Sequence, residues 1–301
     1  MNYRVADIAY SIDFASRINT QKNRLSVLQE RLTTGKRINR ASDDPGGAEI
    51  LLGLRTSQAE IQQFQRSTQA ANQKLTAADD TLNSYETILE RVRTLVTEGL
   101  SDTTTQDARN ALATELATLR TRILNISNTQ NNGEYLFGGT RQDVPPFDPA
   151  TATAAATPTV AQYIQIEPGA NAIQVSVTAN TIFSDATSDI FTDINTATTA
   201  LRGTGNPAAD KTSLQNIGLR LGIYTGLENN ARAIVGANMN ASDIAKDNLS
   251  ANFLSFDERA NDIEGADFAS TAVALTDAQR ALDATLQVAA KGRRSLFDFL
   301  G

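Results

Sequence analysis

The sequence LRTSQAEIQQFQRSTQAANQKLTAADDTLNSYETILERVRTLV (54–96) carries apolar or small residues at intervals that alternate between three and four. This spacing lines one face of a helix, is typical of a coiled-coil seam, and continues without an interrupting proline. A helix from Pro45 to about Glu98 has a length of about 80 Å, which suits a coiled-coil rod better than a compact globule. The expected seam residues are Leu54, Ser57, Ile61, Phe64, Thr68, Ala71, Leu75, Ala78, Leu82, Tyr85, Leu89, Val92 and Val96.

Other segments on both sides of this stretch also have a helical pattern. Residues 14–33 carry a narrow apolar stripe, and Gly35 is expected to end that helix. Residues 106–129 follow the long helix after a short turn, so the two are expected to form an antiparallel hairpin. Helix returns near Asp210, and a last helix contains residues 268–286.

Residues 141–204 differ from the helical segments in composition and in the spacing of their apolar residues. They contain Pro145-Pro146, an Ala/Thr-rich stretch, and two alternating segments, VAQYIQI (160–166) and AIQVSV (172–177), which predict a β-hairpin. The expected fold is therefore mainly α with a small β-containing insertion, with long antiparallel helices forming a coiled-coil rod and the N- and C-terminal helices paired. The expected domains are a terminal coiled coil (1–40 plus 258–301), a helical rod (41–140 plus 205–257) and the insertion (141–204).

Charge is unevenly distributed along the chain. Its net charge is −7, yet residues 1–40 hold eight basic and three acidic side chains, which leaves −12 for the remainder. A basic segment can indicate a nucleic-acid partner. We favour an acidic partner helix instead, because the C-terminal stretch from Asp257 to Asp283 supplies carboxylates in number. We therefore expect no nucleic-acid partner.

The composition excludes several kinds of chemistry. With no cysteine and no histidine in the chain, disulfides, thiolate nucleophiles, His-dependent catalysis and His- or Cys-ligated zinc are ruled out. The carboxylate pairs Asp43-Asp44 and Asp79-Asp80 are interpreted as a helix cap and a solvated helix face, because no convergent reactive group accompanies them. We expect no enzyme activity, no catalytic or metal-binding residues and no cofactor.

The N-terminal sequence MNYRVADIAYSIDF does not resemble a secretory signal, because Asp7 and Asp13 interrupt its apolar residues. No window approaches the length of a membrane-spanning helix, so a membrane location is not expected. If the protein leaves the cell, we expect a route without a cleaved general secretory signal.

The two ends of the chain carry more apolar surface than a two-helix pair can bury. The tail KGRRSLFDFLG (291–301) places four large apolar residues within its last six positions. Each stabilises by roughly 1.5–3 kcal/mol when buried, and exposed apolar surface of this size marks an interface. The candidate assembly residues are Ile18, Leu25, Leu28, Leu32, Leu275, Leu282, Leu286, Leu296, Phe297, Phe299 and Leu300.

Both ends also resemble one known family. LQERLTTGKRINRASDDPGGAEI (28–50), LERVRTLVTEG (89–99) and IEGADFASTAVALTDAQRALDATLQVAAKGRRSLFDFL (263–300) are similar, in order, to segments of the bacterial flagellin superfamily. The likeness covers roughly residues 1–140 and 210–301. In that family a short turn leads from the first helix into the long second one. The matching residues are Gly35, Lys36, Arg37, Ile38, Asn39, Asp43, Asp44 and Pro45.

Within the superfamily, three features resemble the subunits that join hook to filament. These features are the proline in ASDDPGG (41–47), the stretch GEYLFGGTRQDVPPF (133–147) and the ending SLFDFL (295–300). The resemblance implies a structural junction subunit in few copies. The main subunit of the filament, flagellin, is the alternative. A secreted enzyme or a coiled-coil effector is a third hypothesis, for which the chain offers no reactive constellation.

The resemblance also implies a location and partners. Terminal helices would form an inner, axial assembly domain in a homo-oligomeric helical tube, with the insertion facing outward. Export would occur uncleaved through the flagellar type III channel, to the extracellular flagellum. The implied partners are the hook-side junction protein, flagellin, the distal cap and a cytoplasmic export chaperone.

Overall fold

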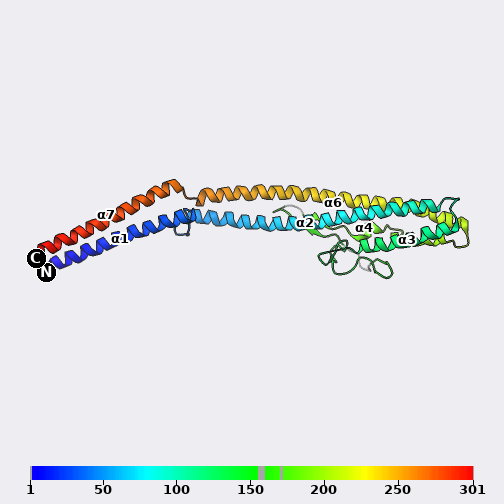
Figure 1. Cartoon of the computed structure of the whole chain (residues 1–301), viewed down its shortest axis with the longest axis horizontal. Coiled ribbons are helices and arrows are strands. Elements are labelled where there is room, and N and C mark those ends of the chain that lie inside the picture. The colour runs from blue at the N-terminus through cyan, green and yellow to red at the C-terminus, as the bar shows by residue number, and fades with distance from the viewer. Residues whose placement is uncertain (1, 155–159, 170–171, 301) are drawn as a thin grey trace. The chain divides into compact units, whose positions relative to one another are not determined.

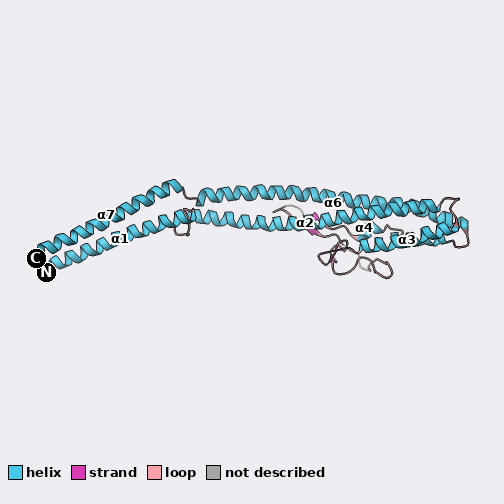
Figure 2. Ribbon diagram, in the orientation of Figure 1, coloured by secondary structure: helices cyan, strands magenta, loops and turns pink. Residues whose placement is uncertain are grey.

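The computed structural model describes residues 2–154, 160–169 and 172–300, and at residues 2–11 and 289–300 it describes the backbone alone. The fold is mainly helical, with two two-stranded antiparallel sheets in the described part (Figures 1 and 2). The expected fold class, helical with a small β-containing insertion, is confirmed. The chain divides into two compact units, which we call the terminal unit (1–60 and 252–301) and the central unit (61–251).

The terminal unit contains α1 (Asn2–Thr34) and α7 (Phe268–Leu300), which lie side by side as an antiparallel pair (Figure 1). It also contains the first turns of α2 (Pro45–Gly99) and the last turns of α6 (Pro207–Glu264). The helix expected over 14–33 begins earlier, at Asn2. No proline or glycine interrupts residues 2–13, so nothing in the backbone prevents this extension.

The central unit is a helical bundle with small irregular additions. Its helices are the remainder of α2 and α6, together with α3 (Gln106–Ser127), α4 (Ala179–Phe183) and α5 (Ile190–Arg202). Thr105 and Asp189 begin α3 and α5, and each side chain accepts a hydrogen bond from a backbone N–H of the first turn. α3 packs against α5.

The heptad pattern of the long helix is confirmed where α2 lies in the central unit. Nearly every expected seam residue from Ile61 to Val96 is buried, and Phe64 is the exception, being half-buried. This seam joins the main core, in which Tyr85, Phe137, Phe147, Phe183 and Phe191 contact one another, mostly edge to face. One stripe along α2 is therefore buried as part of the core of the central unit.

The strands are shorter than their pattern suggests. β1 (Gln130–Asn131) pairs with β2 (Glu134–Tyr135), and β3 (Tyr163–Ile164) pairs with β4 (Ile173–Gln174), both antiparallel. The second pair is the β-hairpin predicted over 160–177. Beyond its short ladder the backbone is held by other hydrogen bonds, such as one from the N–H of Val175 to the carbonyl of Gln162.

Candidate functional site

The turn between α1 and α2 has a specific geometry. Gly35 adopts a φ of 69°, the left-handed conformation that ends many helices. The carboxylate of Asp43 accepts the backbone N–H groups of Asn39 (3.0 Å) and Arg40 (2.9 Å). These hydrogen bonds lower the pKa of Asp43, with that of Arg40 contributing most. Asp43 therefore holds the turn closed and acts as a structural group.

Asp44 caps the N-terminus of α2. Its carboxylate accepts the backbone N–H of Gly47 at 3.0 Å, the geometry of a helix cap, and Pro45 is the first helical residue. The same carboxylate pairs with Arg37 at 3.1 Å. The hydrogen bond from Gly47 and then that from Arg37 lower the pKa of Asp44. The interpretation of this acidic pair as a cap agrees with these contacts.

The turn is bound to the loop between α6 and α7. Lys36 and Gly265 form an antiparallel bridge: the N–H of Arg37 donates to the carbonyl of Glu264 (2.6 Å), and the N–H of Ala266 donates to that of Gly35 (2.9 Å). A β-carbon on Gly265 would lie 2.5 Å from a carbonyl of α6, so glycine is needed there. Segments about 230 residues apart are thereby joined by backbone hydrogen bonds.

Side chains reinforce this connection. The nearly buried carboxylate of Glu264 pairs with Lys36 at 2.8 Å and also with Arg55 of α2. Arg37 donates to the carbonyl of Ile263 at 2.9 Å. Ile38 is buried in a small apolar cluster with Leu51 and Ala260. The ion pair of Lys36 with Glu264 matches the expected meeting of the basic N-terminal segment with C-terminal acids.

The candidate assembly residues on α1 and α7 differ in burial. Leu28 is buried, whereas Ile18, Leu25, Leu32, Leu275 and Leu282 are half-buried and Leu286 is 44% exposed. Other apolar side chains of the pair are more exposed, including Ile12 (64%), Phe268 (67%) and Val273 (63%). The side chains of Leu296, Phe297, Phe299 and Leu300 lie outside the described residues. The α1–α7 pair therefore leaves apolar surface uncovered.

The sequence of this chain is similar to those of known flagellar proteins. Residues 7–142 match the family model of the bacterial flagellin N-terminal helical region. The flagellar hook-associated protein 3 of Salmonella typhimurium is 29% identical over 187 residues, 58% of this chain and 59% of that protein. The protein of the same name in Escherichia coli is 32% identical over 39% of this chain and 38% of its own length. A flagellin of Clostridium tyrobutyricum is 33% identical over 41% of this chain and 33% of its own length.

The N-terminal part of the chain, residues 7–142, is therefore similar to the bacterial flagellins. The chain spans less than two thirds of the length of the curated relatives that it matches. Two solved structures share its fold. One, described as a flagellar hook-associated protein from Vibrio parahaemolyticus, has a TM-score of 0.67 and 21% identity over 74% of this chain and all of that one. The other, the flagellar junction protein FlgL from Legionella pneumophila, has a TM-score of 0.59 and 12% identity over 72% of this chain and all of that one.

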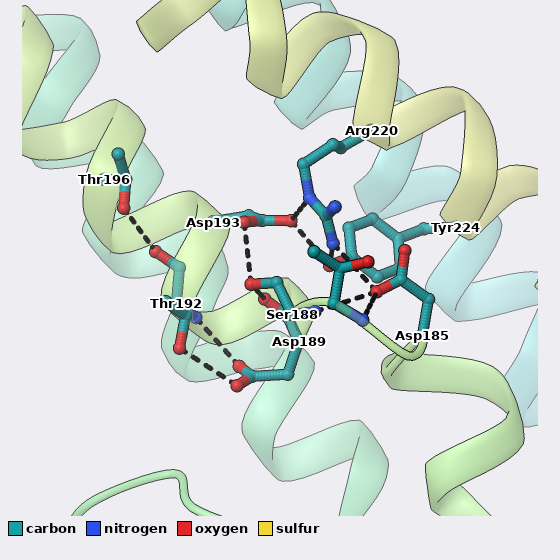
Figure 3. A network of polar contacts seen from close by, with 9 residues as sticks. Asp185, Ser188, Asp189, Thr192, Asp193, Thr196, Arg220 and Tyr224 are labelled. Atoms are coloured by element: carbon teal, nitrogen blue, oxygen red, sulfur yellow. Dashed lines mark hydrogen bonds and ion pairs between the residues drawn. The ribbon is translucent and has the colours of Figure 1, made fainter.

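The structure also contains a polar network that sequence reasoning did not find (Figure 3). Asp193 of α5 accepts hydrogen bonds from Tyr224 (2.6 Å) and Ser188 (2.9 Å), and its carboxylate lies 2.5 Å from the guanidinium of Arg220. Arg220 also pairs with Asp185 at 3.1 Å. Burial and the hydrogen bond to Asp193 raise the pKa of Tyr224, and the bonds from the N–H groups of the 187–188 turn lower that of Asp185.

This network connects α5 and the preceding loop to α6, and every polar group in it has a partner among the described residues. Its chemistry is that of a structural ion pair, with no free nucleophile. Spacing could not have indicated it, because Asp193 and Arg220 are 27 residues apart on different helices. Within the described residues, no helix combines the length and apolar character needed to cross a bilayer.

Proposed function

We propose that this chain is the structural subunit that joins the hook of a bacterial flagellum to its filament. The curated proteins named as hook-associated protein 3 support this, as does a likeness to the fold of a flagellar junction protein. The observation that carries the proposal is the uncovered apolar surface of α1 and α7, which needs other subunits to bury it. The protein acts by assembly and not by catalysis.

The proposal assigns a role to each region. Residues 1–40 and 258–301 form the axial assembly domain, residues 41–140 and 205–257 the surrounding helical domain, and residues 141–204 the outward insertion. Copies pack in a helical tube and contact the hook-side junction protein and the first flagellins. The distal cap and a cytoplasmic chaperone for the C-terminal helix are further proposed partners. Delivery is through the type III channel to the cell exterior.

A deletion strain of the source bacterium tests this function directly. We expect hooks without filaments in electron micrographs and flagellin accumulating in the medium, both restored by a plasmid copy of the gene. Filaments of ordinary length on the deletion strain would refute the proposal.

Filament flagellin is the second candidate, because flagellins also match 40–41% of the chain at 32–33% identity. Abundance separates the two functions. A junction subunit should be a trace component of sheared filaments, measured by quantitative mass spectrometry against the bulk protein. If this chain is itself the bulk protein, the flagellin function replaces the junction function.

A further inference from the structure

The turn between β1 and β2 contains the only Asn-Gly pair of the chain, Asn132-Gly133. The pair forms a two-residue loop, because Asn131 lies opposite Glu134 in the ladder. The φ values of the pair are 54° and 84°, both in the left-handed region. A two-residue hairpin loop with two positive φ values is a type I′ turn, which Asn-Gly and Asp-Gly both favour. The turn therefore needs the glycine but does not need the side-chain amide.

The reactive groups of this pair are accessible. Asn132 and Gly133 are both exposed, and a β-carbon added at Gly133 would meet no atom within 4 Å. Among the described residues, no carbonyl accepts a hydrogen bond from the N–H of Gly133. Because glycine has no side chain, its backbone nitrogen can approach the amide of the preceding residue closely. The nitrogen of Gly133 is thus available to react with the side chain of Asn132.

We propose that Asn132 is a site of spontaneous deamidation. The N–H of Gly133 gives its proton to hydroxide, and the nitrogen forms a bond to Cγ of Asn132. The bond between Cγ and Nδ2 breaks, and Nδ2 takes a proton from water and leaves as ammonia, which regenerates the hydroxide. The product of this step is a five-membered succinimide ring in the backbone.

Water then opens the ring at one of its two carbonyl carbons. Opening at Cγ leaves aspartate in place of Asn132, in an ordinary backbone. Opening at the main-chain carbonyl carbon leaves isoaspartate, in which the backbone runs through Cγ and gains one carbon. In sum, one amide and one water become one carboxylic acid and one ammonia, and nothing is oxidised or reduced. Water does not restore the amide, so converted chains accumulate with time.

The fold allows the ring to close after a small local opening. Closure requires rotation about the backbone bond before the nitrogen of Gly133, and the paired strands restrain this rotation. β1 and β2 have only two residues each, and a two-stranded hairpin is marginally stable by itself. Local openings of this kind cost less free energy than unfolding of the whole unit. The turn therefore protects Asn132 less than a helix protects the asparagines within it.

The converted turn differs from the original in charge and in geometry. Asn132 borders a polar groove whose lining also includes Asp80 of α2 and Lys246 of α6. Either product adds a carboxylate to this groove, close in sequence to Glu134, which is paired with Lys74 at 2.8 Å. Aspartate keeps a pair that favours the type I′ turn, whereas the extra backbone carbon of isoaspartate does not fit a two-residue loop. This inference is independent of the proposed function.

Peptide mapping tests the site on the intact protein. The purified full chain is incubated in neutral buffer for several weeks, and samples are digested and analysed by mass spectrometry. Fragmentation should locate at Asn132 the mass difference between an amide and an acid. Protein isoaspartate methyltransferase should label the isoaspartate form of the same peptide. Asn132→Asp, which keeps a pair that favours the turn, should show no change in mass at this position.

A second variant separates the effect of the fold from that of the sequence. Ala111→Gly makes another Asn-Gly pair, with the exposed Asn110 inside α3, where the N–H of residue 111 donates within the helix. Because a helix interior opens less readily than a two-residue ladder, Asn110 in this variant should convert at least tenfold more slowly than Asn132. Circular dichroism checks that the variant keeps its helices.

Two results would overturn the inference. Equal rates at Asn110 of the Ala111→Gly variant and at Asn132 would show that the turn geometry has no influence. The site itself is wrong if Asn132 stays unconverted in the folded chain while a synthetic peptide of residues 128–138 converts completely in the same buffer.

Discussion

At the scale of the residue, Glu228 places a buried carboxylate in the central unit. Its side chain has no exposed surface, and neither carboxylate oxygen has a hydrogen-bond partner among the described residues. Arg232 lies 3.7 Å away but is shared with Glu86 (2.6 Å) and Asp79 (3.5 Å). Burial raises the pKa of Glu228, Glu86 and Asp79 raise it further, and Arg232 opposes them.

This shift predicts how stability depends on pH. Because the folded-state pKa lies above the ordinary value of 4.5, the folded chain holds the proton more tightly than the unfolded chain. The stabilisation is complete below about pH 4.5 and is lost as pH rises through the folded-state pKa. Glu228→Gln should remove this loss and raise Tm by a few degrees at neutral pH, measured by thermal circular dichroism from pH 4 to 8.

Glu90→Gln on the exposed face of α2 is the control, since Glu90 is well exposed. It should leave Tm unchanged across the same range. A Glu228→Gln variant whose Tm follows the wild-type pH curve would show that Glu228 does not titrate in this window.

At the scale of the element, the Asp193 network decides how α5 is held against α6. Asp193 is 5% exposed and joins Arg220, Tyr224 and Ser188. Asp193→Ala leaves the guanidinium largely desolvated without its main partner, a loss that typically costs about 3–5 kcal/mol. The measurement is the urea concentration at the midpoint of unfolding of the central unit, monitored by circular dichroism.

Tyr224→Phe is the matched comparison, because it removes the hydroxyl that donates to Asp193 and accepts from Arg220, and it keeps the ring. Its cost should be about 1 kcal/mol for each hydrogen bond. Equal losses from the two variants would mean that the ion pair contributes nothing beyond these hydrogen bonds.

The α1–α7 pair is the second element that can be tested. Leu28 of α1 is buried and Leu282 of α7 is half-buried. Leu28→Asp or Leu282→Asp should abolish filament formation, because a carboxylate on the apolar stripe must be desolvated in the assembly. The central unit should keep its helical circular dichroism signal, since neither residue belongs to it.

Ser26→Asp adds the same charge at an exposed position of α1 and is the control. Assembly is scored by electron microscopy of complemented deletion strains. Normal filaments with both leucine variants would show that the stripes are not the assembly surface.

At the scale of the whole molecule, assembly depends on the ends of the chain. Removal of residues 291–301 takes away four large apolar side chains, each stabilising by roughly 1.5–3 kcal/mol when buried. We expect the truncated protein to remain monomeric in sedimentation and not to rescue the deletion strain. Its far-ultraviolet circular dichroism spectrum should retain most of its helical signal. A truncated chain that restores filaments would exclude the tail from the interface.

Much of the fold could be predicted because helical periodicity is local. The seam from Ile61 to Val96, the cap at Asp44 and the stop at Gly35 are all encoded within a few residues of where they act. The predicted start of the first helix, at residue 14, is too late, because the prediction follows the apolar stripe. The helix α1 begins at Asn2, since no proline or glycine interrupts the residues before the stripe. The assembly role of the terminal residues remains a prediction.

The sequence by itself determined the helices, their buried stripes and the resemblance to flagellins, since each depends on short-range order along the chain. Only the tertiary structure decided which distant groups meet. Glu264 joins Lys36, Asp193 joins Arg220, and Glu228 is enclosed without a hydrogen-bond partner among the described residues. The physical reason is that spacing along one helix sets a residue's direction on that helix, whereas its neighbours depend on how helices pack.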